Sequence, residues 1–227
     1  MEYPPLLQAA WQGNLDEVKR LHAKGASIDE QHKNGTTALM LAAEKGHLNV
    51  VTYFLESGAD PKAETRMGGT ALNRAAENGN LEVMKYLLEN DVEIGDLAVI
   101  VAAREGRLEA VKLLIGSGAN INAQQRWGQT ALMLAAREGH TEVVKYLLEK
   151  GANVRVKDKN GDTALNIAID NDNADIVMHL RRAGARAEAR KVPVLPEEED
   201  DDDSDADDMD DVIVEDDDIP DDVGLDD

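Results

Sequence analysis

The heptapeptide "TALMLAA" occurs twice in this chain of 227 residues, at Thr37–Ala43 and again at Thr130–Ala136. The two copies begin 93 positions apart. A match of this length within one chain indicates an internal repeat. The third residue of each copy has counterparts along most of the chain, at Leu6, Leu39, Leu72, Val99, Leu132 and Leu165.

The spacing of these counterparts gives the period of the repeat. Successive steps are 33, 33, 27, 33 and 33 residues, so the period is 33 and one unit is six residues short. The interval of 93 residues contains two full steps and the short one. We therefore divide the repeat region into six units, at about 1–32, 33–64, 65–94, 95–124, 125–157 and 158–190.

Each unit predicts a turn followed by two helices. A glycine turn such as "NGTTAL" leads to a threonine, whose hydroxyl can accept a hydrogen bond from a free N–H group at a helix start. A short alanine-rich helix follows, and a second helix such as "TEVVKYLLEK" has apolar residues at helical spacing. Between the two helices, a left-handed residue is expected at Gly46, Gly79, Gly106, Gly139 and Asp172.

These landmarks together resemble the ankyrin repeat, over about Pro5 to Arg190. The resemblance implies an all-α ankyrin-repeat solenoid of paired antiparallel helices, in which projecting turns, called fingers, join successive units. The family's usual T-P-L-H sequence is altered here to TALM or TALN, and to LAVI in the short unit. Its histidine is replaced by Met40, Asn73, Ile100, Met133 and Asn166.

The six missing residues can be placed in one finger. "DVEI" at Asp91–Ile94 matches "GANI" at Gly118–Ile121, so the chain lacks a counterpart of Asn122–Trp127. Asp96 is expected to replace threonine as the cap of the following helix. Two interpretations stay open: the solenoid tolerates a trimmed loop, or the gap receives a bulky element of a partner.

The two ends of the repeat region carry cations on their second helices, as capping units would. The first unit has Lys19, Arg20 and Lys24 there, and the sixth has Arg181 and Arg182. Since terminal units face water, a polar outer face is expected at both ends.

Acidic residues are concentrated after the repeats. Of the 46 Asp and Glu residues, 20 lie in Glu197–Asp227, which contains no Lys or Arg. The preceding residues then carry 26 acidic and 24 basic groups. We expect a repeat domain at 1–190, an extended linker at 191–196 ("KVPVLP") and a disordered acidic tail at 197–227.

Three roles are open for the tail. It can act as a solubilising chain, or as a polyanion that binds a basic client, as histone or ribosomal-protein chaperones do. It can also fold back onto cationic finger tips, where tethering raises its effective concentration and salt weakens the attraction. Within it, "VIVEDDD" at Val212–Asp218 resembles a SUMO-interacting motif, which binds by adding a strand to a sheet edge.

Several other classes of protein are disfavoured. The absence of cysteine excludes disulfides and thiol chemistry, and we find neither a signal peptide nor an apolar run of membrane-spanning length. The histidines lack a nearby nucleophile, carboxylate pair or metal-ligand spacing, and the resemblance implies a structural role for His47 and His140. We expect a cytoplasmic (or, in a eukaryote, nuclear) monomer without catalytic activity, cofactor or metal.

The fingers supply the candidate binding residues, because the resemblance implies that fingers and exposed first-helix ends contact partners. A cation stands at each finger tip, and exposed tryptophan is typical of interface hot spots. Alternatively, the cations form a solvated face and Trp11 packs on "YPPLL". Nucleic acid is a poor partner, since the tail repels phosphates. We predict a protein-binding adaptor whose contact residues are Trp127, Arg126, Met67, Arg66, Lys33, Lys159 and Trp11.

Overall fold

The computed structural model describes residues 3–187, which form helices joined by turns. The predicted linker at 191–196, the tail at 197–227 and the "VIVEDDD" motif lie outside the described residues. Within residues 3–187 there are twelve helices, two for each predicted unit. They are α1 (Pro5–Gln12), α2 (Leu15–Ala23), α3 (Ala38–Lys45), α4 (Leu48–Glu56), α5 (Ala71–Asn78), α6 (Leu81–Glu89), α7 (Leu97–Arg104), α8 (Leu108–Gly116), α9 (Ala131–Arg137), α10 (Thr141–Glu149), α11 (Ala164–Asp170) and α12 (Ala174–Arg182).

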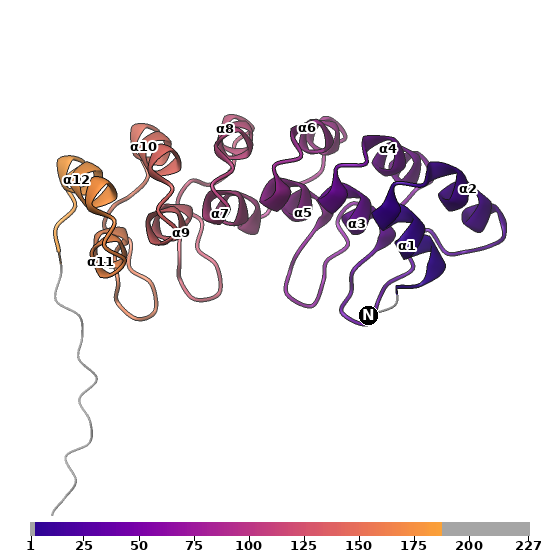
Figure 1. Ribbon diagram of the computed structural model, residues 1–227, viewed down its shortest axis with the longest axis horizontal. Coiled ribbons are helices and arrows are strands. Elements are labelled where there is room, and N and C mark those ends of the chain that lie inside the picture. The colour runs from indigo at the N-terminus through magenta and orange to yellow at the C-terminus, as the bar shows by residue number, and fades with distance from the viewer. Residues whose placement is uncertain (1–2, 188–227) are drawn as a thin grey trace, which may run out of the picture. The chain divides into compact units, whose positions relative to one another are not determined.

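The helices lie in two rows (Figure 1). The first helix of each unit packs against the first helices of its neighbours, and the second helices form the other row. The fingers project beyond the row of first helices. The all-α repeat architecture predicted from the 33-residue period is therefore confirmed.

The starts and ends of the first helices follow the predicted chemistry. The hydroxyl oxygens of Thr37, Thr70, Thr130 and Thr163 each accept a hydrogen bond from the N–H of the residue three places later. Backbone φ is positive at all five predicted left-handed positions, from 55° at Asp172 to 78° at Gly139. Helices this short are unstable alone, so packing between units must stabilise them.

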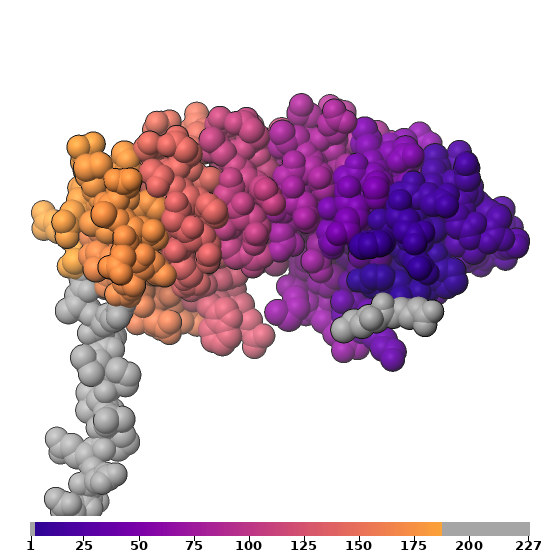
Figure 2. Space-filling model, viewed as in Figure 1, coloured from indigo at the N-terminus to yellow at the C-terminus, as the bar shows by residue number. Residues whose placement is uncertain are grey.

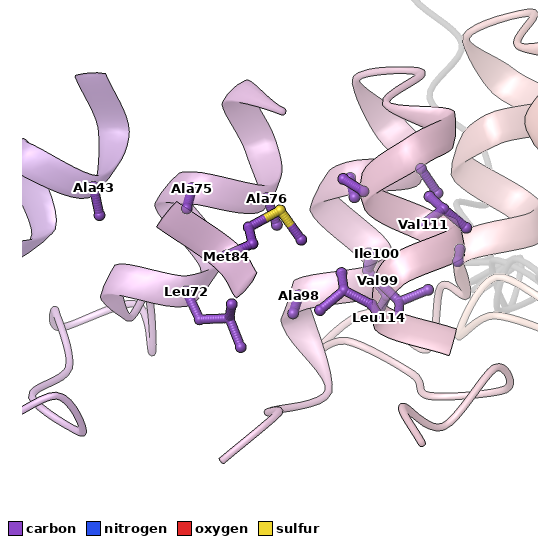
Figure 3. Close-up of a cluster of buried hydrophobic side chains, with 14 of the residues drawn as sticks. Ala43, Leu72, Ala75, Ala76, Met84, Ala98, Val99, Ile100, Val111 and Leu114 are labelled. Carbon is purple, nitrogen blue, oxygen red and sulfur yellow. The ribbon is translucent and has the colours of Figure 1, made fainter. Parts of the chain in front are cut away.

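The packing is close because alanine lines the first helices. Ala75, Ala76 and their counterparts in the first five units are buried, and one apolar cluster runs through the units. Figure 3 shows Leu72 and Met84 on the third unit and Val99 on the fourth as parts of this cluster. The core is therefore continuous across the junction where the period is short.

The short unit lacks its finger, as predicted. The connection from α6 to α7 is residues 90–96, seven residues, whereas 14 residues connect each of the other second helices to the next unit. No finger projects between α6 and α7 in Figure 1, and Figure 2 shows an open notch there between the neighbouring fingers.

The predicted cap at Asp96 is wrong. Asp96 already has helical backbone angles (φ −56°, ψ −29°), and its side chain makes no capping hydrogen bond. A capping side chain requires an extended backbone. Helix α7 begins one residue early in the repeat register, at Leu97, which takes the position that threonine occupies in the neighbouring units and has no hydroxyl.

Candidate protein-binding surface

Each of the four fingers ends in the same three-residue tip, a cation followed by a variable residue and a glycine. In the tip Arg126-Trp127-Gly128, the N–H of Gly128 donates to the carbonyl of Gln125 (2.7 Å), and the N–H of Gln125 donates to that of Gln129 (3.0 Å). Gly128 has φ +77°, which favours glycine because it lacks Cβ. The three other tips are Lys33-Asn34-Gly35, Arg66-Met67-Gly68 and Lys159-Asn160-Gly161.

The tips are joined in twos. The N–H of Arg66 donates to the carbonyl of Asn34 (3.0 Å), and the N–H of Lys159 donates to the carbonyl of Trp127 (3.0 Å). Both bonds run from the cation of one tip to the variable residue of the preceding tip. We call the fingers with tips at 33–35 and 66–68 the first finger pair, and those with tips at 126–128 and 159–161 the second finger pair.

The missing finger separates the two pairs and leaves one backbone group without its counterpart on each side. In the repeat register, the carbonyl of Met67 would accept from a third tip, and the N–H of Arg126 would donate to it. Among residues 3–187, neither group takes part in a hydrogen bond. We call the space between the two pairs the finger gap. Its margins are a free acceptor at Met67 and a free donor at Arg126.

The second finger pair holds a tryptophan at the margin of the gap. Trp127 is 62% exposed, although tryptophan is highly buried on average. The guanidinium carbon of Arg126 lies 5.8 Å from the centre of its ring, and the ammonium nitrogen of Lys159 lies 6.0 Å from it. Such contacts with an aromatic face are mildly attractive. The ring therefore lies close to two cations while much of it stays accessible.

The first finger pair presents a second apolar side chain at the opposite margin. Met67 is 82% exposed, beside Arg66 in the same turn. The structure thus places Arg66 and Met67 on one margin of the gap, and Arg126 and Trp127 on the other. Lys159 shares the second pair with Trp127, and Lys33 lies in the outer finger of the first pair.

Trp11 is not part of this arrangement. It lies in the last turn of α1, where the ammonium nitrogen of Lys45 is 5.2 Å from the centre of its ring. Its backbone carbonyl accepts a hydrogen bond from Nε2 of His47 (3.1 Å). Its side chain is 44% exposed, so Trp11 is a separate candidate contact on the first and second units.

A ladder of charges on the first helices was not predicted. Arg74 lies 3.8 Å from Glu44 and 3.6 Å from Glu77, and the guanidinium of Arg104 contacts Glu77 at 2.6 Å. The hydrogen bond from Arg104 to Glu105, aided by both carboxylate charges, raises the pKa of Arg104. The ladder crosses the junction that lacks a finger. Glu44, Glu77 and Arg104 share one position of the repeat, so the register could have revealed them.

Two predicted structural histidines and three other residues connect consecutive units. Nε2 of His140 bonds to the carbonyl of Arg104 (2.8 Å), while His47 and Arg107 make the same kind of contact. At the same position, Nδ2 of Asn80 donates to the carbonyls of Ala43 (2.8 Å) and Glu44 (2.9 Å), and Asn173 does likewise. Their partners are carbonyls at first-helix ends, so these residues stabilise the stack.

Two further features concern only the described part of the chain. Residues 3–187 contain no group of His, Asp and Glu side chains placed to hold a metal ion. None of the helices in this range is long and apolar enough to span a membrane.

Comparison with known proteins places the chain among repeat proteins. No curated protein matches its sequence. A profile of ankyrin repeats (three copies) matches residues 6–97 and 99–191. Among solved structures, the chain is similar to the human ASB11 ankyrin repeat domain, with 28% identity over 82% of this chain and 86% of that chain, and a TM-score of 0.74.

Two bacterial structures are also similar. One is a complex of the predatory endopeptidase Bd0816 from Bdellovibrio bacteriovorus with the immunity protein Bd3460 (30% identity, 80% of this chain, 99% of that chain, TM-score 0.69). The other is an ankyrin repeat domain from Acinetobacter baumannii AYE (30% identity, 80% of this chain, 98% of that chain, TM-score 0.67). From the repeat register, the paired helices and the matching profile, we conclude that the chain belongs to the ankyrin-repeat family, whose domains typically serve as protein-binding modules.

Proposed function

We propose that this protein is a non-enzymatic adaptor that binds a partner protein through its two finger pairs, with an element of the partner inserted in the finger gap. One observation carries the proposal. The same backbone hydrogen bond joins the tips within both pairs and is missing across the gap. A partner segment that supplies both bonds restores the register of the finger row.

The margins of the gap define the chemistry of this segment. The carbonyl of Met67 calls for a donor and the N–H of Arg126 calls for an acceptor, which an extended or turning backbone provides together. The exposed side chains of Met67 and Trp127 favour apolar contacts, since tryptophan anchors many interfaces. Arg66 and Arg126 beside them favour carboxylates. The expected partner element is therefore an acidic turn with an apolar side chain.

The solved relatives support a protein partner. The structure that contains Bd3460 is a complex of that immunity protein with an endopeptidase. The present chain is 30% identical to the matched chain of that structure, over 80% of its own length. This similarity supports the proposed class of partner, and the features that select the partner are those of the finger gap described above.

The acidic tail supports a second candidate function. The 20 acidic residues of Glu197–Asp227 suit a chaperone or masking factor for a basic client. In the adaptor, the same acids compete with an acidic partner for the cationic tips. The two functions predict opposite charges for the partner, so the charge of a captured protein distinguishes them.

The test compares full-length variants as baits in a lysate of the source organism. The gap is altered by Met67→Ser with Trp127→Ser, and separately by inserting Asn-Ala-Gln-Gln-Arg-Trp, the sequence of Asn122–Trp127, between Ile94 and Gly95. Asn160→Ser is the matched control, because Asn160 has the place of Trp127 in the neighbouring finger. In a further bait, the 20 acidic residues of Glu197–Asp227 are replaced by Gln and Asn.

The adaptor function requires an acidic protein that is retained by the native and Asn160→Ser chains and lost from both gap variants. It also requires stronger retention when the tail is neutralised. A basic protein that is lost only on neutralising the tail would instead support the chaperone function. Equal retention by all five baits, the native chain included, would refute both functions.

A further inference from the structure

The outer face of the sixth unit carries an apolar surface that the neighbouring units do not have. Ile169 on α11 is 40% exposed and Met178 on α12 is 41% exposed. They line a shallow groove of about 580 Å³ with Ala168, Asp172, Ala174, Val177, Arg181 and Arg182. We call it the terminal groove. The predicted polar cap is therefore incomplete, since Arg181 and Arg182 border a surface that is apolar at its centre.

Comparison of the six units shows that this surface is specific to the sixth. The position of Ile169 is alanine in every other unit: Ala10, Ala43, Ala76, Ala103 and Ala136. The position of Met178 is polar in every other unit: Lys19, Thr52, Lys85, Lys112 and Lys145. A terminal unit that faces water is expected to become more polar than the internal ones. Here both positions have changed in the opposite direction, which indicates that something covers them.

We propose that Val212–Asp218 of the same chain, "VIVEDDD", binds in the terminal groove. This inference uses other residues than the finger gap and is independent of the proposed function. Val212, Ile213 and Val214 form the longest apolar run of 197–227, and four acids follow them directly. The groove has a matching pattern, since its apolar floor lies beside two arginines and a single carboxylate, that of Asp172, so that its charged side chains carry a net positive charge.

The length of the intervening chain allows the contact. Ala187 is the last described residue, five residues after α12 ends at Arg182. The 25 residues from there to Val212 can span roughly 80 Å when extended, whereas the groove lies on α11 and α12 themselves. A tether of this kind gives an effective concentration on the order of millimolar, so a weak contact suffices. A second copy would bring Arg181 and Arg182 against the same two residues and is less favourable.

The experiment measures paramagnetic broadening of methionine methyl signals in the full-length protein. The chain has no cysteine, so Met209→Cys creates a single site for a nitroxide three residues before Val212. Met178 reports on the terminal groove and Met67 on the finger gap, while Met40, Met84 and Met133 are buried references. The control chain also carries Val212→Ser, Ile213→Ser and Val214→Ser. A matched control carries Val223→Ser and Leu225→Ser instead.

The proposal requires that the Met178 signal lose most of its intensity in the labelled chain. The signal must recover in the Val212→Ser, Ile213→Ser, Val214→Ser chain and stay weak in the matched control. Equal Met178 intensity with and without the three serines would overturn the proposal. Selective loss at Met67 would overturn it in favour of the tail binding at the fingers. Loss at Met178 that disappears on dilution would overturn it in favour of a second copy.

Discussion

Restoring the missing finger should stabilise the repeat domain. The change is the six-residue insertion between Ile94 and Gly95 described above, which lengthens the connection from α6 to α7 from seven to 13 residues. A third tip can accept from the N–H of Arg126 and donate to the carbonyl of Met67. These are the bonds that the existing pairs make at 3.0 Å. In the native protein both groups are exposed to water, so each new bond contributes to stability only the difference between a hydrogen bond within the protein and one to water.

The expected gain follows from two opposing terms. Two hydrogen bonds contribute about 1 kcal/mol each, and nearly doubling the connection costs about 0.6 kcal/mol in chain entropy. The net stabilisation is about 1.4 kcal/mol, or about tenfold in the equilibrium for opening the tip. The assay is amide hydrogen exchange at Arg126, with urea unfolding as the global measure. Exchange at Arg126 should slow by about tenfold.

Insertion of six Gly and Ser residues at the same place is the control. It lengthens the connection without the finger sequence, so it should lower stability slightly and leave the exchange of Arg126 unchanged. If the native finger sequence also leaves Arg126 unprotected in a chain of normal helix content, the register argument for the finger gap is wrong. Amides of Arg66 and Lys159, which are already paired, should exchange alike in all three proteins.

Two further changes test the contacts between units. Asn80→Ala removes two hydrogen bonds to the end of α3 and should lower the free energy of unfolding in urea by about 1–3 kcal/mol. The control Asn78→Ala loses only a bond within its own helix and should have a smaller effect. Equal losses of stability in the two variants would contradict the role given to Asn80. Gly106→Ala should destabilise by at least about 1 kcal/mol, because φ is +66° and the new Cβ would lie 2.6 Å from the ring of His140. Gly116→Ala, in open space at the end of α8, should instead stabilise by about 0.5–1 kcal/mol, and a loss at both glycines would show that the left-handed turn is not the cause.

Most of the fold could be predicted because the same landmark residues recur in successive units of the sequence. A threonine, an alanine-rich run and a glycine recur at one register, so each unit checks the others. The prediction for Asp96 failed where this redundancy ends. Only the short unit has leucine in the threonine position, and which residue begins α7 depends on backbone angles that no second copy reveals.

The candidate surface was predictable only in part. The exposed cations and the neighbouring Met67 and Trp127 could be found from their place in the finger tips. The pairing of fingers could not, because a backbone hydrogen bond such as that from Lys159 to Trp127 leaves no mark on side-chain identity. The ion pairs of the charge ladder were also missed. The register shows that charged residues recur at first-helix ends, but the contacts of Glu44 with Arg74 and of Glu77 with Arg104 form only when the units stack.

The absent finger has a mechanical consequence. The junctions of the fourth unit with the third and the fifth both lack a tip bond, so helix packing and the contacts of Arg104, Arg107 and His140 hold them, whereas the junction within each finger pair has a tip bond in addition. Since repeat proteins unfold as chains of coupled units, a pulling force or a low concentration of denaturant should separate the units first at one of the two junctions of the fourth unit. A break between the third and fourth units would leave three units on each side, which is about the smallest number that remains folded. The fourth unit, which has no finger, is therefore the mechanically weakest region of the finger row.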